Sequence, residues 1–283
     1  MAAFFVVSGY VSYKREVKLQ SIVHRAQQLL LPYFSWSFLS AIFEKGCDFS
    51  WMLTYIIQPD TSYWFIWVLF FISTIVLLIQ SIAEKWGMPK DILLLVGGAI
   101  LMLAVIFFNV KLFGFHFISY YFCFYVAGLL LKKYEIRLSC SIFVLVGVIW
   151  IILSVFWRQH DVPEIVKWIS FLPSSITIYI YRLITAMLGS LFFYEFACRL
   201  MNKSSVLISL LSYFGRVSLG IYVIHLFFRA VVGDAYLNLF VSNTDIIFIS
   251  IDFIVKLGVG VLGSYIISKN PLLSYYLLGK RFR

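Results

Sequence analysis

The stretch YWFIWVLFFISTIVLLIQSIA, residues 63–83, decides the fold class because it carries no charged side chain over the length of a membrane-spanning helix. A span needs about 20 predominantly apolar residues. Other segments reach or approach that length: 1–13, 30–43, 92–110, 115–131, 140–157, 176–198, 217–233 and 246–268. Only 13% of the 283 residues are charged and 62% are hydrophobic, which leaves too little charge for a water-facing surface. We therefore expect an all-α, polytopic transmembrane helical bundle of about nine spans, forming a single domain over residues 1–283.

The basic residues predict the side of the membrane on which each loop lies. The chain holds 23 Lys and Arg against 13 Asp and Glu, a net charge of +10. If the connection at residues 14–29 is cytoplasmic and each segment crosses once, sixteen of the 23 basic residues fall in cytoplasmic loops. The outer loops then hold four: Lys45, Lys111, Arg158 and Lys167. This bias follows the positive-inside rule, so membrane lipid explains the charge and no nucleic-acid partner is expected.

Sequence motifs of soluble enzymes and metal sites are missing from the chain. The four cysteines are scattered without a CxxC pair, so neither a disulfide framework nor a bound metal is expected. HExxH, GxSxG, P-loop and dinucleotide-binding patterns are also missing. Functional residues are therefore expected among the polar side chains within the apolar segments, where charge is costly.

A polar stripe lies in the predicted span at residues 217–233. Ser218, Tyr222, His225 and Arg229 recur at helical spacing and therefore share one face of that helix. Such a stripe can fix helix packing through interhelical hydrogen bonds. It can also line a polar cavity in which an imidazole moves a proton. The sequence leaves both interpretations open.

Four further charged residues fall within predicted spans: Arg182, Glu195, Asp252 and Lys256. Asp252 and Lys256 lie four residues apart and are expected to pair on their own helix. Glu195 lies close to the cytoplasmic end of its span, and Arg182 lies one to two turns from the outer end. We expect each of these two side chains either to snorkel to the membrane surface or to face the interior of the bundle.

Four short segments resemble signatures of the membrane acyltransferase 3 family, the bacterial O-acetyltransferases of surface glycans. They are FFVVSGY at 4–10, Arg25 followed by LLLPY at 29–33, WFIWVL at 64–69, and FGRVSLGIYVIH at 214–225. Their order and spacing are more specific than any one segment. The family usually has ten spans, and the first has no counterpart here. The resemblance therefore implies an N-terminally truncated acyltransferase-like domain.

The resemblance implies transfer of an acyl group, expected to be acetyl, from acetyl-CoA to a hydroxyl of a cell-surface polysaccharide or its lipid-linked precursor. Arg25, Lys18 and Arg15 in the cytoplasmic loop are expected to bind the phosphates of this donor. Gln28 stands where the family often has a second arginine, which predicts a weaker phosphate clamp. The implied location is the bacterial cytoplasmic (inner) membrane, as a multi-pass protein without a metal cofactor.

The family's first helix carries a histidine implicated in acyl transfer, and this sequence has no matching position. The resemblance therefore assigns no catalytic residue in this chain. His225, Tyr222 and Arg229 are candidates for a supporting role in a polar cavity. Two alternatives stay open: a transporter or flippase of a glycan intermediate, and an inactive truncated acyltransferase.

Overall fold

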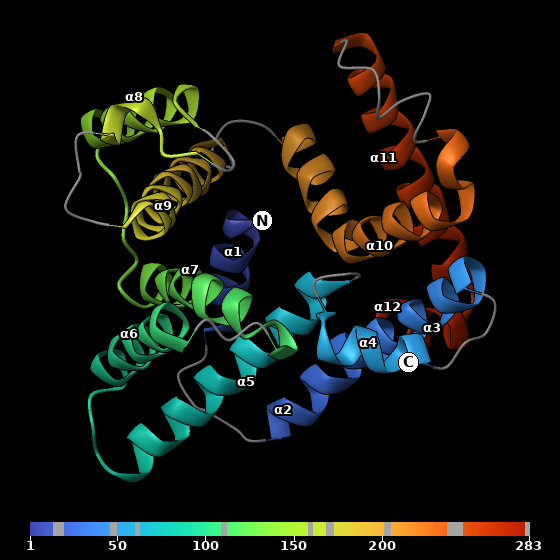
Figure 1. The fold of residues 1–283 in the computed structure, drawn as a ribbon, viewed down its shortest axis with the longest axis horizontal. Coiled ribbons are helices and arrows are strands. Elements are labelled where there is room, and N and C mark those ends of the chain that lie inside the picture. The colour runs from blue at the N-terminus through green and yellow to red at the C-terminus, as the bar shows by residue number, and fades with distance from the viewer. Residues whose placement is uncertain are drawn as a thin grey trace. The chain divides into compact units, whose positions relative to one another are not determined.

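The computed structural model describes residues 1–13, 20–45, 50–59, 63–108, 112–157, 161–167, 173–200, 205–236 and 246–280 (Figure 1). These residues form helices and no strands, which confirms the all-α prediction. The α-helices are α1 (Ala2–Ser12), α2 (Gln20–Arg25), α3 (Leu31–Lys45), α4 (Ser50–Ile57), α5 (Trp64–Lys85), α6 (Lys90–Phe108), α7 (Phe115–Lys133), α8 (Cys140–Val155), α9 (Ser174–Leu200), α10 (Ser205–Tyr236), α11 (Ile246–Lys269) and α12 (Pro271–Leu278). The π-helix η1 (Ala26–Leu30) and the 3₁₀ turns η3 (Leu112–Gly114) and η4 (Glu164–Val166) lie between them.

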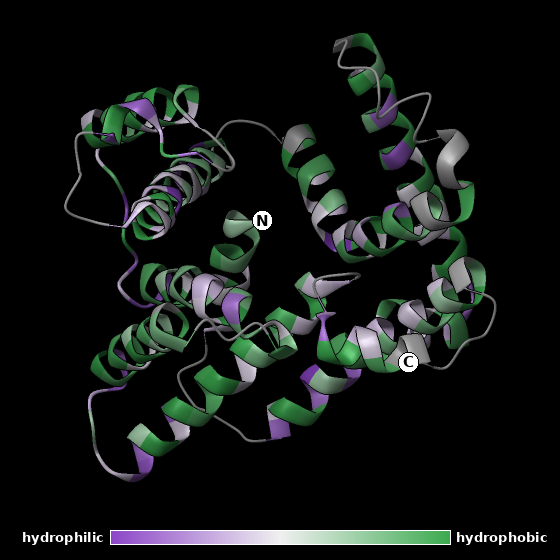
Figure 2. Cartoon of the chain, viewed as in Figure 1, coloured by the Kyte–Doolittle hydropathy of each residue, from purple (hydrophilic) through white to green (hydrophobic). Residues whose placement is uncertain are grey.

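Each of the predicted spans coincides with a helix, from α1 through α11. Among the described residues, five helices are long and apolar enough to cross a membrane: Trp64–Lys85, Leu112–Lys133, Ser174–Leu200, Ile208–Phe228 and Ile247–Lys269. Figure 2 shows apolar residues along these helices and hydrophilic residues toward helix ends such as the C-terminal end of α5. The chain is therefore a helical, multi-pass membrane protein.

Three short helices, α2, α4 and α12, lie outside the predicted spans because each is far shorter than a bilayer. Local sequence explains α12. The Asn270 side chain accepts the N–H groups of Leu272 and Leu273, and Pro271 occupies the first turn. Gly279 ends the helix in the left-handed conformation with φ of 62°.

The chain divides into two compact units, and the prediction of a single domain stays a prediction. Unit 1 comprises Met1–Lys18, Ile72–Val110 and Phe115–Ser205. Unit 2 comprises Leu19–Phe71, Lys111–Gly114 and Val206–Arg283. Helix α5 begins in unit 2 and continues into unit 1.

Unit 1 is held together by close packing of α1 on α7. A Cβ at Gly9 would strike the Tyr125 carbonyl, and a Cβ at Gly128 would strike the Val6 carbonyl. The two backbones therefore touch directly, as small residues permit in membrane helix pairs. The Phe5 ring stacks on Tyr121 with centroids 4.5 Å apart, and Phe5 itself is fully buried.

Unit 2 packs α3 against α12 and the start of α5. The Trp36 indole N–H donates to the Leu277 carbonyl at 2.8 Å. The Ser40 and Tyr63 hydroxyls share a buried hydrogen bond of 2.8 Å. The Trp67 indole N–H donates to the Phe113 carbonyl at 3.0 Å. These polar contacts each join segments distant in sequence, so they fix the helices where apolar packing alone is not directional.

The π-helix η1 interrupts the run from α2 into α3 at the segment that resembles the family's basic loop. Pro32 lies in the first turn of α3, as the sequence predicts, but helical backbone also precedes it. Because proline has no N–H, it cannot donate to the carbonyl four residues earlier, which belongs to Gln28. A Cβ at Gly279 would strike that same carbonyl. The end of α12 therefore lies directly against the irregular turn.

Candidate functional site

His225 lies on α10 with its ring orientation fixed by the backbone. Its Nδ1 lies 3.0 Å from the Ile221 carbonyl oxygen. Because a carbonyl can only accept, this contact assigns the proton to Nδ1 and leaves the lone pair on Nε2. A neutral histidine in this tautomer can accept a proton from, or a hydrogen bond of, a bound hydroxyl.

Tyr222 lies one helical turn before His225 and connects α10 to α5. The Phe65 backbone N–H donates to the Tyr222 hydroxyl oxygen at 3.4 Å, and the two rings meet edge to face with centroids 5.4 Å apart. The Tyr222 and His225 ring centroids lie 5.8 Å apart. Phe65 belongs to the WFIWVL segment, so two of the four segments noted in the sequence meet at this point.

The Asp252–Lys256 pair forms on α11 as the sequence predicts, with Lys256 Nζ 2.7 Å from an Asp252 oxygen. Both side chains lie within electrostatic range of His225. Sequence spacing within one helix could not show that the pair on α11 and the stripe on α10 belong to one region.

Small residues bring α10 and α11 together. A Cβ at Gly220 would strike the Ser264 hydroxyl, and a Cβ at Gly260 would meet Ile221 at 3.0 Å. The Ser264 hydroxyl is satisfied by the Gly260 carbonyl of its own helix. Gly260 and Ser264, spaced four apart on α11, were the available signal for this contact.

Several residues predicted from the resemblance are not placed by the structure. Lys18 and Arg15 lie outside the described residues, and the side chain of Arg229 on α10 is likewise not described. Arg25 ends α2, is half-buried and directly precedes η1. The donor-binding role of this loop therefore stays a prediction.

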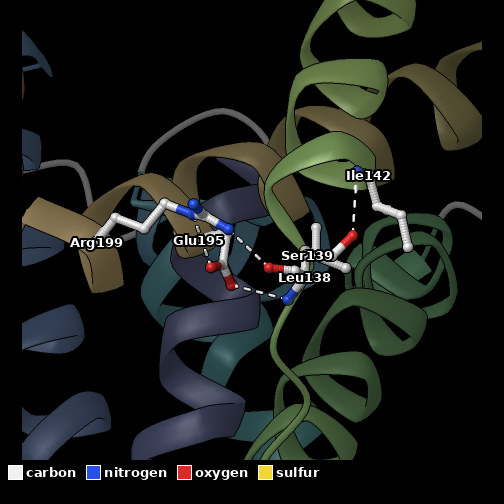
Figure 3. A network of polar contacts seen from close by, with 5 residues as sticks. All are labelled: Leu138, Ser139, Ile142, Glu195 and Arg199. Atoms are coloured by element: carbon white, nitrogen blue, oxygen red, sulfur yellow. Dashed lines mark hydrogen bonds and ion pairs between the residues drawn. The ribbon is translucent and has the colours of Figure 1, made fainter.

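A second polar cluster lies at the C-terminal end of α9 in unit 1 (Figure 3). Glu195 is only 3% exposed and does not snorkel to the surface. Its carboxylate accepts from Arg199 Nε at 2.9 Å and from the Leu138 N–H at 3.3 Å. Arg199 also donates to the Leu138 carbonyl at 2.7 Å. This network connects the loop before α8 to helix α9, and the charges of Glu195 and Arg199 neutralise each other.

Near the same end of unit 1, Asp91 joins α6 to the end of α7. Lys133 Nζ lies 2.6 Å from an Asp91 oxygen, and the Tyr134 hydroxyl donates to the same oxygen. Burial by itself raises the pKa of Asp91, but the hydrogen bonds from Lys133 and Tyr134 and the Lys133 charge outweigh it. The pKa of Asp91 therefore lies below its ordinary value.

A third polar cluster lies near the N-terminal ends of α7 and α9. The Arg182 guanidinium lies over the Trp157 ring at 5.5 Å from its centroid. Its Nε is buried without a hydrogen-bond partner among the described residues, and so are the hydroxyls of Ser119 and Tyr179. The Tyr120 and Tyr179 rings meet with centroids 5.3 Å apart. The charge of Arg182 was visible in the sequence, but the two hydroxyls beside it gave no periodic signal.

The chain matches a known family model over most of its length. A model described as an acyltransferase domain covers residues 1–269, which include His225, Glu195 and Arg182 with the polar groups around each. No curated protein and no solved structure matches the chain.

Proposed function

As a member of the acyltransferase 3 family, this chain is a multi-pass membrane acyltransferase, and we propose that it acylates a hydroxyl of a cell-surface polysaccharide or its lipid-linked precursor. The proposed donor is an acyl-coenzyme A, with acetyl as the group transferred, and the proposed location is the bacterial cytoplasmic membrane. The observation that carries the proposal is the family match over residues 1–269. The resemblance of four separate segments, two of which meet at Tyr222, supports it.

The reaction needs one proton acceptor, one stabiliser of negative charge and a leaving thiolate. The acceptor hydroxyl loses its proton as its oxygen attacks the thioester carbonyl carbon. The carbon–sulfur bond then breaks, and the coenzyme A thiolate leaves and takes up a proton. An ester forms and a free thiol is released, so no oxidant, reductant or metal is required by the balance.

His225 and Tyr222 are proposed to support this step from the α10 face. The fixed Nδ1–H leaves His225 Nε2 able to accept a hydrogen bond from the acceptor hydroxyl. The Tyr222 hydroxyl accepts from Phe65 and can still donate to a bound oxygen. Arg229 on the same stripe is proposed to add positive charge. We assign these residues positioning roles and assign the catalytic base to none of them.

The donor is proposed to bind at the loop that contains Arg25, Lys18 and Arg15. Coenzyme A carries phosphate charges, and basic side chains bind phosphate through charge-assisted hydrogen bonds. Arg25 directly precedes the π-turn at Ala26–Leu30, and irregular helical turns of this kind often occur at functional sites. Gln28 adds no charge there, so the clamp depends on the remaining basic residues.

A labelling assay tests the proposed function. The protein is expressed from its own gene, with any in-frame sequence upstream of residue 1, and membranes receive radiolabelled acetyl-CoA and host glycan. We expect label in the glycan as an alkali-labile ester. Arg25→Gln should raise the KM for acetyl-CoA about tenfold, the size expected for one lost charge-assisted hydrogen bond. Lys280→Gln, which removes an exposed positive charge near the C-terminus, is the matched control.

The roles of His225 and Tyr222 are tested in the same assay. Tyr222→Phe should lower kcat by about tenfold while KM for acetyl-CoA stays unchanged, because one hydrogen bond to a bound oxygen is lost. His225→Gln should also flatten the lower limb of the pH–rate profile. Movement of glycan across the membrane without any ester formation would instead support the transporter and overturn the acyltransferase.

A further inference from the structure

We propose that Ser119, Tyr179 and Arg182 form a subsite in unit 1 that binds a phosphate group carried by the lipid-linked acceptor. The identity of the acceptor rests on the proposed function, whereas phosphate binding itself does not depend on it. Its residues all belong to unit 1, whereas His225 and Tyr222 belong to unit 2.

The strongest evidence is an arginine without an anion. Arg182 forms no ion pair with any residue that the structure describes, and its Nε is buried without a hydrogen-bond partner. Among the described residues, its guanidinium lies over the face of Trp157 and within electrostatic range of Tyr120. A charge within a membrane-spanning helix is costly, most of all near the bilayer centre and less toward the headgroups. A purely structural arginine recovers that cost through a carboxylate, as Arg199 does with Glu195.

Two hydroxyl donors lie with the guanidinium. Tyr179 precedes Arg182 by three residues, so both side chains project from one face of α9. The ring contact between Tyr120 and Tyr179 brings α7 beside this face, and Tyr120 lies within electrostatic range of both Tyr179 and Arg182. Ser119 on α7 is fully buried and lies close to the Tyr179 hydroxyl, and no described residue gives its hydroxyl a hydrogen bond of normal geometry. A guanidinium and two hydroxyls together suit an anionic group with several oxygens, and phosphate provides them.

The position along α9 suits a phosphate at headgroup depth. The helix has 27 residues and is therefore about 40 Å long, against a hydrocarbon core of about 30 Å. Arg182 lies about 12 Å from the first residue of α9, so its side chain can reach the boundary between hydrocarbon and headgroups. Helices α7 and α9 end on Lys132, Lys133 and Arg199, which places the subsite at the opposite, predicted outer side.

Binding of a short prenyl phosphate tests the subsite directly. Purified full-length protein in a neutral detergent is titrated with farnesyl phosphate and, separately, with farnesol, and binding is followed by tryptophan fluorescence. We expect farnesyl phosphate to bind at least about tenfold more tightly than farnesol, because charge-assisted hydrogen bonds are lost in the alcohol. Equal binding of the two probes would overturn the proposal.

Variants locate the phosphate at the three residues. Arg182→Gln should weaken farnesyl phosphate binding about tenfold, and Ser119→Ala or Tyr179→Phe about two- to fivefold, in line with the difference between charged and neutral donors. Lys167→Gln removes an exposed positive charge on the same predicted side and should change nothing. Equal loss in Arg182→Gln and Lys167→Gln would show general surface attraction and overturn the subsite. Because the two hydroxyl deletions are small, they keep the test valid if Arg182→Gln does not fold.

A competition experiment identifies which molecule carries the bound phosphate, a bilayer lipid or the lipid-linked acceptor. If phosphatidylglycerol displaces farnesyl phosphate at equal concentration, the subsite holds a bilayer lipid and the acceptor role is wrong. In the labelling assay, Arg182→Gln should raise KM only for acceptors that carry phosphate and leave neutral glycans unaffected. If the wild-type protein labels none of the acceptors, the proposed function itself is wrong, whatever the subsite binds.

Discussion

The two ends of α9 carry one arginine each, and their surroundings differ in a way that separates structural charge from functional charge. Near the C-terminal end, Arg199 binds a buried carboxylate and a backbone carbonyl. Near the N-terminal end, Arg182 has an aromatic face and buried hydroxyls but no anion among the described residues. The first arrangement stabilises the fold by itself. The second is complete only when something else is bound, so the two ends should respond oppositely to mutation.

The largest effect is expected from breaking the paired end. Glu195→Ala leaves Arg199 without its carboxylate and the Leu138 N–H without its acceptor. We expect a loss of about 2 kcal/mol in the free energy of unfolding, because the carboxylate is buried while the arginine left behind is one-third exposed. Unfolding in mixed detergent and SDS micelles measures it. Glu84→Ala, at the exposed pair with Lys90, is the control and should cost less than about 0.5 kcal/mol. Equal losses would show that burial of Glu195 does not matter.

A smaller loss in the free energy of unfolding is expected when Arg199 is replaced by lysine, which keeps the positive charge but has a different shape. Arg199 uses Nε for Glu195 and a terminal nitrogen for Leu138. A lysine cannot make both contacts in this fork geometry, so Arg199→Lys should lower the unfolding free energy by about 1 kcal/mol. Arg182→Lys, measured in the same way without ligand, should change it by less. A larger effect at Arg182 would reverse the comparison.

The unpaired end should tolerate loss of a polar group. Ser119 is fully buried and its hydroxyl lacks a partner among the described residues. Ser119→Ala removes an uncompensated polar atom, so the unfolding free energy should stay the same or rise by up to about 1 kcal/mol. The buried Ser190 hydroxyl donates to the Ala186 carbonyl, and Ser190→Ala should lower stability slightly. Thermal unfolding of both variants in detergent checks the difference in sign.

The smallest effect is a pH dependence at Asp91. Its pKa is lowered in the folded protein, so the contribution to stability is fully present above the ordinary carboxyl pKa of about 4 and is lost as pH falls through the folded value. The pair is partly exposed, so the contribution should not exceed about 0.5 kcal/mol. Melting temperatures of the wild type and Asp91→Asn should differ at pH 6 and converge toward pH 3. A constant difference would show that the Asp91 charge is not responsible.

The sequence predicts the helices well and their polar contacts less well. Apolar runs such as 63–83 define a span through length alone, which is why a helix occupies every predicted segment. Helix ends are harder to predict. Helix α10 begins at Ser205 and not at 217, and the prediction missed its first turns because polar and apolar residues are mixed there. The spacing of four residues predicts the pair Asp252–Lys256 and also allows Glu195–Arg199.

Contacts between distant segments were beyond reach of the sequence. Nothing in the periodicity of α10 indicates that Tyr222 would meet Phe65, and the loop residue Leu138 carries no side-chain signal for its two hydrogen bonds. The polar stripe at 218–229 was predictable as a face of α10, but its closeness to Asp252 and Lys256 depends on how α11 packs. Helical spacing fixes neighbours on one helix, whereas contacts between helices depend on packing that is specified by many side chains together.

The close approach of Gly279 to the Gln28 carbonyl has a consequence for biosynthesis. The ribosome makes Gln28 long before Gly279, and at about 5–20 residues per second the interval lasts on the order of tens of seconds. Throughout that time residues 26–30 are in the nascent chain without the segment that covers them in the folded protein. The segment at 271–279 thus covers a segment that is made much earlier, and an added side chain at position 279 would obstruct this contact.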